Sequence, residues 1–252
     1  MTKKAIFNWS GGKDSALALY RLLQNSEYQE IRLLTSINQQ YQRITMHGVR
    51  EELLEKQAQK LQLPLHKLYL PNKPGMEPYN QLMQETLQKF TDEGFSEAIF
   101  GDIFLEDLRM YREERLQEAG FTARFPLWKE DTRSLMRQFI DLGFKTIVVC
   151  VKSDVLDKSF AGRVIDHQFL KDLPGSVDPC GENGEFHTFV YDGPIFSEPV
   201  SFQKGEVIYR EYKVPESKEE KTSQAPSKDI CRKSSMGFWF CNLLPVKSSS
   251  LP

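Results

Sequence analysis

The chain has few cysteines and no long uninterrupted apolar run. Its four cysteines among 252 residues, Cys150, Cys180, Cys231 and Cys241, form no Cys-x-x-Cys pair. Such scattered cysteines lack the spacing of a zinc or iron–sulfur site and of a disulfide framework. No apolar run approaches the roughly 18 residues that a membrane-spanning helix needs. We therefore expect neither a cysteine-based metal centre nor a membrane partner.

An excess of either charge is also missing. Lysine and arginine number 33 and aspartate and glutamate 35, which gives a net charge of −2. A strong nonspecific grip on nucleic acid requires a clearly basic surface, so nucleic acid is not an expected partner, although the total allows a local basic patch. The first four residues lead directly into an apolar segment and leave no room for a signal peptide. We expect a cytoplasmic protein.

What the chain does contain is a glycine turn near its start. Residues 5–9 are apolar and rich in strand formers, and a helical pattern begins after Ser10-Gly11-Gly12. A strand that turns through two glycines into a helix N-terminus binds anions, because backbone N–H groups approach closely and the helix dipole adds roughly half a positive charge. An ordinary glycine turn before a helix is the alternative. The residues that we predict to bind a nucleotide here are Ser10, Gly11, Gly12, Lys13, Asp14 and Ser15.

Apolar runs alternate with helical patterns after this turn. The spacing is typical of βαβ units and predicts an α/β fold with a mainly parallel sheet covered by helices. Ligands of such sheets lie beyond the carboxyl ends of the strands, so Thr35, Ser36 and Gly101 are expected beside the glycine turn. We place a nucleotide-binding domain at residues 1–128. The strands are expected at 5–9, 31–37, 65–70, 97–101, 122–125 and 145–151, and the later helices at 49–61, 79–92, 107–119 and 131–142.

The pattern changes after residue 128. Residues 129–212 are expected to form a smaller α+β domain that closes over the nucleotide. Its expected elements are a helix at 160–173, a polar glycine-rich loop at 175–194 and a strand pair at 199–214 that turns at Lys204-Gly205.

Residues 213–252 are expected to be a flexible connector and an apolar C-terminal tail. Residues 216–233 are charged and poor in apolar side chains, which is typical of a connector. Residues 237–244 (GFWFCNLL) are apolar and should dock on this chain or on a second subunit, as in a homodimer. A disordered, sticky tail is the alternative.

Polar residues at the strand ends are candidates for chemistry. Asp102 directly follows an expected strand and can hold Mg²⁺ on phosphates or orient the substrate, and the alternative is an N-cap for the next helix. His47 follows the second strand, where an adenine or ribose would sit, although a lone histidine is weak evidence. Arg109 and Arg112 share a helical face and can steady pyrophosphate or a carboxylate, unless they form a solvated face.

A second polar stretch holds two carboxylates and a histidine within six residues. Glu182, Glu185 and His187 lie on a backbone loosened by two glycines. Glu185 and His187 share a face in an extended segment and can hold an ammonium ion or take a proton from it. An exposed loop is one alternative. Metal binding is another, but two glutamates and one histidine make a thin zinc set.

Four motifs together resemble a known family. Residues 10–15 resemble the PP-loop of the ATP pyrophosphatases, which split ATP into AMP and pyrophosphate. Residues 101–103, with Arg109 downstream, residues 126–128 (PLW) and residues 181–188 (GENGEFHT) follow in order. In this order and spacing they are similar to the diphthine–ammonia ligase family, over about residues 4–212.

The resemblance implies a HUP-like PP-loop fold, with ATP, Mg²⁺ and ammonium as co-substrates. Family members amidate a carboxylate, that of diphthine on elongation factor 2 in archaea and eukaryotes, and another acceptor is expected where diphthamide is not made. In this interpretation Lys13 stabilises pyrophosphate and Asp102 holds Mg²⁺. Glu182, Glu185 and His187 serve the acceptor and ammonia. Two other functions stay open: a PP-loop enzyme that adenylates a tRNA base or small metabolite, and a nucleotide sensor without catalysis.

Overall fold

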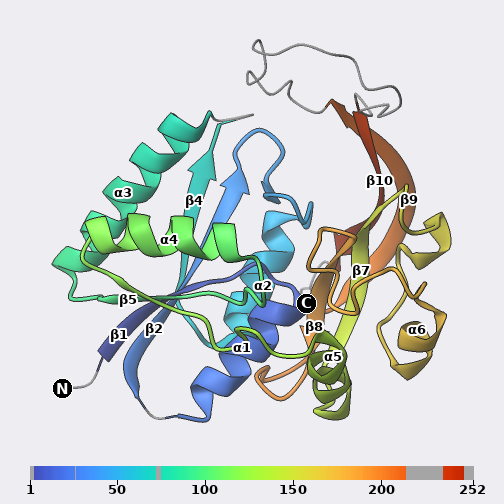
Figure 1. The fold of residues 1–252 in the computed structure, drawn as a ribbon, viewed down its shortest axis with the longest axis horizontal. Coiled ribbons are helices and arrows are strands. Elements are labelled where there is room, and N and C mark those ends of the chain that lie inside the picture. Colours follow the sequence, from blue (N-terminus) through green and yellow to red (C-terminus); the bar gives the residue numbers. More distant parts are fainter. Residues whose placement is uncertain (1–2, 26, 72–74, 214–234, 247–252) are drawn as a thin grey trace, which may run out of the picture.

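Two β-sheets form the framework of the molecule (Figure 1). The computed structural model describes residues 3–25, 27–71, 75–213 and 235–246. In the first sheet β2, β1, β5 and β6 lie side by side in that order and are parallel, β4 runs parallel to β2, and β3 returns antiparallel on β2. The strands are β1 (Lys3–Asn8), β2 (Tyr28–Asn38), β3 (Arg43–Ile44), β4 (Leu65–Leu70), β5 (Glu97–Ile99) and β6 (Thr122–Arg124).

Helices cover both faces of this sheet. Helices α1 (Lys13–Leu23) and α2 (Glu51–Leu61) lie on the face toward the second sheet, and α3 (Met76–Asp92) and α4 (Glu106–Glu118) lie on the other (Figure 1). Two apolar cores correspond to these two faces, one including Leu19 and the other Phe90. The predicted α/β fold, a mainly parallel sheet covered by helices, is therefore confirmed.

The second sheet is antiparallel, with the strand order β8-β7-β10-β9. Helices α5 (Thr132–Asp141) and α6 (His167–Asp172) accompany it, so the expectation of a smaller α+β part is met. Its apolar residues join one continuous core with α1 and α2. The strands are β7 (Lys145–Lys152), β8 (Phe186–Asp192), β9 (Phe202–Lys213) and β10 (Ser235–Pro245).

Several predicted elements of this half are wrong. Residues 145–151 do not extend the parallel series, because β7 pairs with β8 and β10 instead. The predicted helix at 160–173 contains a 3-10 turn that ends at Phe160 and the short α6, because Val164 between them forms a bridge to Ile147. The loop at 175–194 contains β8, and the strand pair at 199–214 is one strand that runs through Lys204-Gly205.

The apolar segment at 237–244 docks on its own chain. It lies in β10, which pairs with β7 on one side and with β9 on the other. Residues 235–245 are thus an inner strand of the second sheet and not a tail beyond it. The predicted connector at 216–233 lies outside the described residues.

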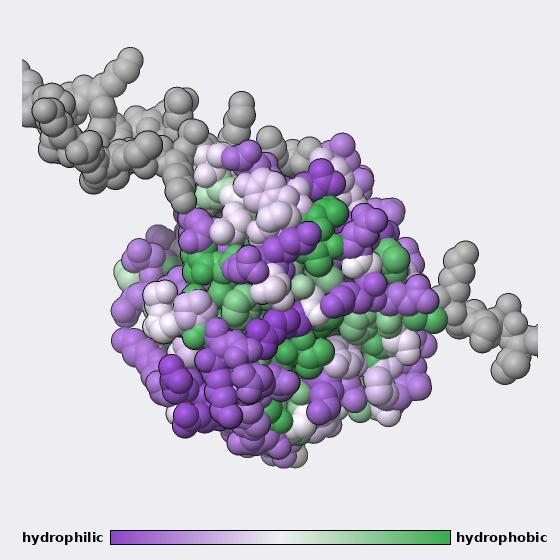
Figure 2. Space-filling view, turned by 90° about the vertical axis from the view of Figure 1, so that its right-hand side faces the viewer, coloured by the Kyte–Doolittle hydropathy of each residue, from purple (hydrophilic) through white to green (hydrophobic). Residues whose placement is uncertain are grey.

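The face formed by the second half is chemically mixed. Figure 2 shows apolar residues in separate patches among hydrophilic ones. Among the described helices, none has the length and apolar character needed to cross a membrane.

Candidate nucleotide-binding site

The glycine turn connects β1 to α1, as the sequence predicts. Gly12 is the extended N-cap residue of α1 and has no side chain of its own to cap this helix end. Gly11 adopts a φ of +77°, and a Cβ there would lie 2.7 Å from Oε1 of Gln57. Both the backbone angle and the lack of space require glycine. The result is a helix N-terminus whose backbone an anion can approach closely.

Two serines tie the turn together. The hydroxyls of Ser10 and Ser15 lie 3.1 Å apart, and the Ser15 hydroxyl donates to the Gly12 carbonyl at 2.9 Å. The Gly12 amide in turn donates to the Ser10 hydroxyl at 3.2 Å. These hydrogen bonds hold the loop in one shape. A preorganised loop binds an anion at a lower cost in conformational entropy.

Strand β8 of the second sheet closes against this loop. The Lys13 amide donates to the Thr188 hydroxyl at 3.0 Å, and the Val190 amide donates to the Gly11 carbonyl at 2.9 Å. The fully buried Gln57 side chain donates to the carbonyls of Gly11 and Val190 and accepts from the Trp9 indole. The site is therefore built by both halves of the chain.

Gln57 and Thr188 are residues that the sequence prediction missed. Gln57 lies on the inward face of α2 among leucines, and a polar residue in an apolar stripe is a signal that it has buried partners. Thr188 belongs to the polar stretch at residues 181–188, but no local sequence pattern shows that its hydroxyl accepts from the Lys13 amide, 175 residues away.

Lys13 is buried beside carboxylates. Its ammonium group donates to Asp14 at 2.6 Å and lies 5.5 Å from the centre of the Phe186 ring. Burial lowers the pKa of Lys13, but the negative charges of Asp14 and Glu182 and the bond to Asp14 outweigh it and raise the pKa overall. Lys13 therefore carries its positive charge at neutral pH, next to the glycine turn at residues 10–12.

Glu182 and Asp102 lie near this pair. Burial, followed by the charge of Asp14, raises the pKa of Glu182 to about 7. Its Oε1 accepts from the Ile103 amide at 2.9 Å, which joins the polar stretch to the end of β5. Asp102 forms an ion pair with Arg112 and does not cap α4, whose N-cap residue is Leu105. Burial raises the pKa of Asp102 as well.

Glu185 is buried inside its own loop, with 5% of its surface exposed to solvent. Its carboxylate accepts from the amide of Asp178 at 3.1 Å and from the amide and side chain of Asn183 at 2.9 and 3.1 Å. Both oxygens are thus engaged by neighbouring backbone and side chain. Glu185 precedes β8 and holds the loop in shape, and no hydrogen bond joins it to His187.

His47 and His187 come together across the two halves. Their ring centres are 4.5 Å apart, and a Cβ on Gly12 would lie 3.2 Å from the His47 ring. Burial and the nearby Lys13 lower the pKa of His187 to about 4, and burial followed by His187 lowers that of His47. Both rings are therefore neutral at pH 7, beside the phosphate loop. Nδ1 of His47 is buried and has no partner among the described residues.

Three other predicted residues serve the framework. Thr35 donates its hydroxyl to the Trp9 carbonyl at 2.6 Å. Ser36 accepts at its carbonyl from Thr45 at 2.7 Å, which fixes the segment before His47. A Cβ on Gly101 would lie 2.9 Å from the backbone of α1, so Gly101 lets the end of β5 pack directly against the first turn of that helix.

Among the described residues, no group of three or more His, Cys, Asp or Glu side chains is arranged to hold a metal ion. A magnesium ion on a nucleotide needs one or two carboxylates, because phosphate oxygens and water fill its other positions. Asp14, Asp102 and Glu182 interact electrostatically with one another. This donor set fits a nucleotide-bound Mg²⁺ and does not fit a metal site made of protein alone.

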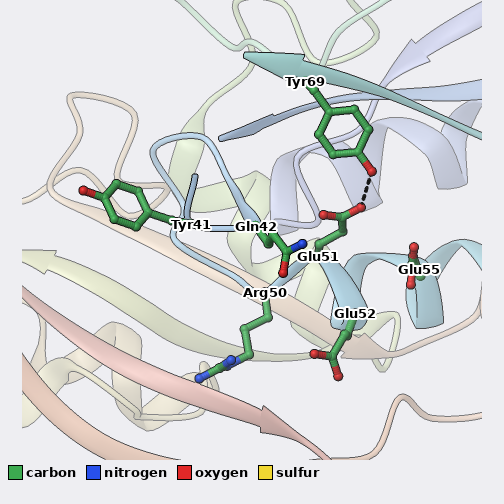
Figure 3. Close-up of a pocket in the computed structure, with 7 residues that line it drawn as sticks. All are labelled: Tyr41, Gln42, Arg50, Glu51, Glu52, Glu55 and Tyr69. Carbon is green, nitrogen blue, oxygen red and sulfur yellow. Dashed lines mark hydrogen bonds between the residues drawn. The ribbon is translucent and has the colours of Figure 1, made fainter. Parts of the chain in front are cut away.

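A hollow of about 270 Å³ lies away from the phosphate loop (Figure 3). It is found at the N-terminal end of α2, where Tyr69 donates to Glu51. Its lining residues are Tyr41, Gln42, Arg50, Glu51, Glu52, Glu55 and Tyr69.

Known domain families match both halves of the chain. The profile of the diphthamide synthase N-terminal domain matches residues 3–123, and that of the diphthamide synthase C-terminal domain matches residues 131–217. The chain belongs to the diphthamide synthase family. Curated proteins that are similar to this chain include diphthine–ammonia ligases.

Two of these relatives show the extent of the similarity. The diphthine–ammonia ligase of Schizosaccharomyces pombe is 26% identical over 130 residues, which are 46% of this chain and 22% of that protein. The Homo sapiens protein is 29% identical over 87 residues, 32% of this chain and 33% of that protein. The chain thus matches about a third or less of each relative. A solved structure from Methanocaldococcus jannaschii, described as a predicted subunit of tRNA methyltransferase, aligns over 74% of this chain and 96% of its own at 18% identity, with a TM-score of 0.39.

Proposed function

We propose that this protein is an ATP-dependent ligase that activates a carboxylate as its adenylate and amidates it with ammonium. The observation that supports this most directly is the glycine-lined N-terminus of α1 beside the buried, charged Lys13. This arrangement suits a polyphosphate, and the chain's family contains curated diphthine–ammonia ligases.

The first step uses the phosphate loop. A carboxylate oxygen of the acceptor attacks the α-phosphorus of ATP, and the bond to the β-phosphate breaks to release pyrophosphate. The Gly11 amide and the ammonium of Lys13 stabilise the charge that develops on the departing group. Mg²⁺, when bound, neutralises phosphate charge, and Asp102 and Asp14 are the carboxylates that we propose hold it.

The second step uses the polar stretch. Ammonia attacks the acyl carbon of the adenylate, and AMP leaves with the electron pair of the broken bond. Ammonium must first lose a proton, and a carboxylate with a pKa of about 7 is matched to accept it at neutral pH. We therefore assign this role to Glu182. Glu185, which accepts three hydrogen bonds within its own loop, supports that loop. The neutral rings of His47 and His187 form a wall of the site.

The acceptor that we propose is diphthine on elongation factor 2, as the names of the relatives suggest. A different carboxylate acceptor would use the same two steps. Since the second half of the chain carries Glu182 and His187, the acceptor is expected to approach from that side.

The products of ATP test this proposal. The protein with ATP, Mg²⁺, ammonium and diphthine-bearing elongation factor 2 should release AMP and pyrophosphate and gain one amide on the factor, as chromatography and mass spectrometry would record. A matched reaction with unmodified factor should release neither. ADP and phosphate as products would refute the adenylation chemistry, and ATP binding without turnover on any acceptor would indicate a sensor.

A further inference from the structure

Two half-buried arginines lie opposite each other where the two halves of the chain meet. Arg43 of β3 and Arg50, at the start of α2, lie directly opposite each other in an isolated antiparallel bridge. Burial lowers the pKa of Arg43, and the charge of Arg50, followed by that of the exposed Arg210 of β9, lowers it further. Like charges placed opposite each other destabilise an antiparallel pair. The pair is therefore unfavourable as it stands.

No carboxylate in the described part of the chain forms an ion pair with Arg43 or Arg50, and the glutamates that line the hollow beside Arg50 do not contact it within ion-pair distance. Arg43 donates to two neutral acceptors, the Gly48 carbonyl at 2.5 Å and Oδ1 of Asn242 at 3.2 Å. The Nε of Arg50 is buried and lacks a partner. The arginine ion pairs of the described residues involve other arginines throughout, namely Arg21, Arg32, Arg109, Arg112, Arg115, Arg124 and Arg163.

The surroundings show why this charge is unusual. Arg133 and Arg137 of α5 also form no ion pair, but both are exposed, so water solvates them. Arg43 and Arg50 are half-buried, and an unpaired charge or donor in such a place is costly. Figure 3 shows Arg50 extending away from Glu51, which is occupied by Tyr69 and Lys67.

We propose that Arg43 and Arg50 bind one oxyanion, a phosphate or carboxylate group of a ligand, at the junction of the two halves. Guanidinium groups match such oxyanions because their N–H donors form a planar fork. The glutamates that line the adjoining hollow disfavour an extended polyanion, so a single anionic group fits better than a nucleic acid strand. The site is separate from the phosphate loop and does not rest on the proposed ligase activity.

Binding of inorganic phosphate to variants tests the proposal. Gly12→Val removes the phosphate loop as a competing site, and calorimetry at fixed ionic strength then follows the arginine site alone. Adding Arg43→Gln or Arg50→Gln should weaken phosphate binding at least about 10-fold, while the matched exposed control Arg133→Gln should leave it unchanged. Acetate in place of phosphate distinguishes a carboxylate ligand from a phosphate ligand. Equal phosphate affinity in all these variants, or no phosphate binding to Gly12→Val, would overturn the proposal.

A second measurement covers the case in which Gly12→Val fails to fold. In the unmodified chain Arg50→Gln should raise the Tm in phosphate-free buffer, because like-charge repulsion is relieved, and should reduce the further rise that phosphate produces. A purely structural role for Arg50 predicts the opposite, a lower Tm with an unchanged phosphate effect.

Discussion

At the scale of single residues, neighbouring groups of the same type have different environments. Glu182 and Glu185 lie three positions apart, yet burial raises the pKa of Glu182 to about 7, while Glu185 is held by three hydrogen bonds from its own loop. Spacing along the chain groups these two carboxylates together. Their surroundings in the fold distinguish them: Glu182 is the candidate proton acceptor, and Glu185 supports its loop.

Gly12 offers a direct test of the phosphate loop. A Cβ there would lie 3.2 Å from the His47 ring and 3.3 Å from the Thr188 hydroxyl, so the side chain of Gly12→Val has no room. We expect ATP binding by calorimetry to be lost. Gly175→Val is a matched control, because no atom lies within 4 Å of its new Cβ, and it should bind ATP as the unmodified chain does. Unchanged ATP affinity in Gly12→Val would place the nucleotide elsewhere.

Glu182 should determine the pH dependence of amide formation. It must be ionised to accept a proton, so kcat/KM for ammonium should rise as the pH increases through about 7. Glu182→Gln should remove this limb and lower the rate about 10²-fold, with ATP affinity nearly unchanged. The free energy of unfolding depends on pH in the opposite sense. Because the pKa of Glu182 is raised on folding, its contribution to the free energy of unfolding falls as the pH rises from 4.5 toward 7.

Glu185→Gln is the comparison for that experiment. It should reduce the free energy of unfolding by about 1–3 kcal/mol through lost hydrogen bonds, and the ascending pH limb should remain. If the limb disappears in Glu185→Gln and persists in Glu182→Gln, the two roles are exchanged and Glu185 is the proton acceptor.

At the scale of elements, one buried carboxylate connects four strands. Glu97 begins β5 and accepts from Lys3 of β1 at 2.8 Å, Tyr28 of β2 at 2.6 Å and Arg124 of β6 at 3.1 Å. In the sheet these four strands lie side by side in the order β2-β1-β5-β6. Burial alone would raise the pKa of Glu97, but the three bonds outweigh it and lower the pKa to about 2.

The depressed pKa gives a stability prediction. The ionised form of Glu97 favours folding, so its contribution is complete above the usual pKa of 4.5 and is lost as the pH falls toward 2. Glu97→Gln should lower the free energy of unfolding by about 2 kcal/mol at pH 7, and the difference should shrink steadily below pH 4.5. Urea titrations at several pH values measure it. Glu118→Gln, at an exposed pair with Arg115, should change little, and a pH-independent effect of Glu97→Gln would contradict the assignment.

At the scale of the whole molecule, the candidate site exists because two sheets meet. The phosphate loop belongs to the first half, while Thr188, Val190 and His187 belong to β8 of the second. Helices α1 and α2 carry the shared core between the sheets. The proposed arginine site lies at the same junction, because Arg43 of the first half donates to Asn242 of β10.

The sequence by itself determined the parallel sheet of the first half and the glycine turn between its first strand and helix. Strand β4 has the predicted bounds, and the other parallel strands and their helices differ by a few residues, because local apolar periodicity and the glycine turn specify such units. The predicted helix at 160–173 and the strand pair at 199–214 were wrong for a related reason. In the second half, pairing between distant strands overrides local pattern, as in the single long β9 with its partner β10.

Tertiary structure decided what each candidate residue does. Asp102 received an arginine partner, Glu185 was enclosed by its loop, and His47 was brought against His187 from 140 positions away along the chain. Gln57 gained its role because β8 passes beside the loop that it supports. A one-dimensional pattern supplies the chemical type of a side chain. The burial of the side chain and its hydrogen-bonding and ionic partners decide its charge and which groups it can contact. Both depend on contacts that only the folded chain creates.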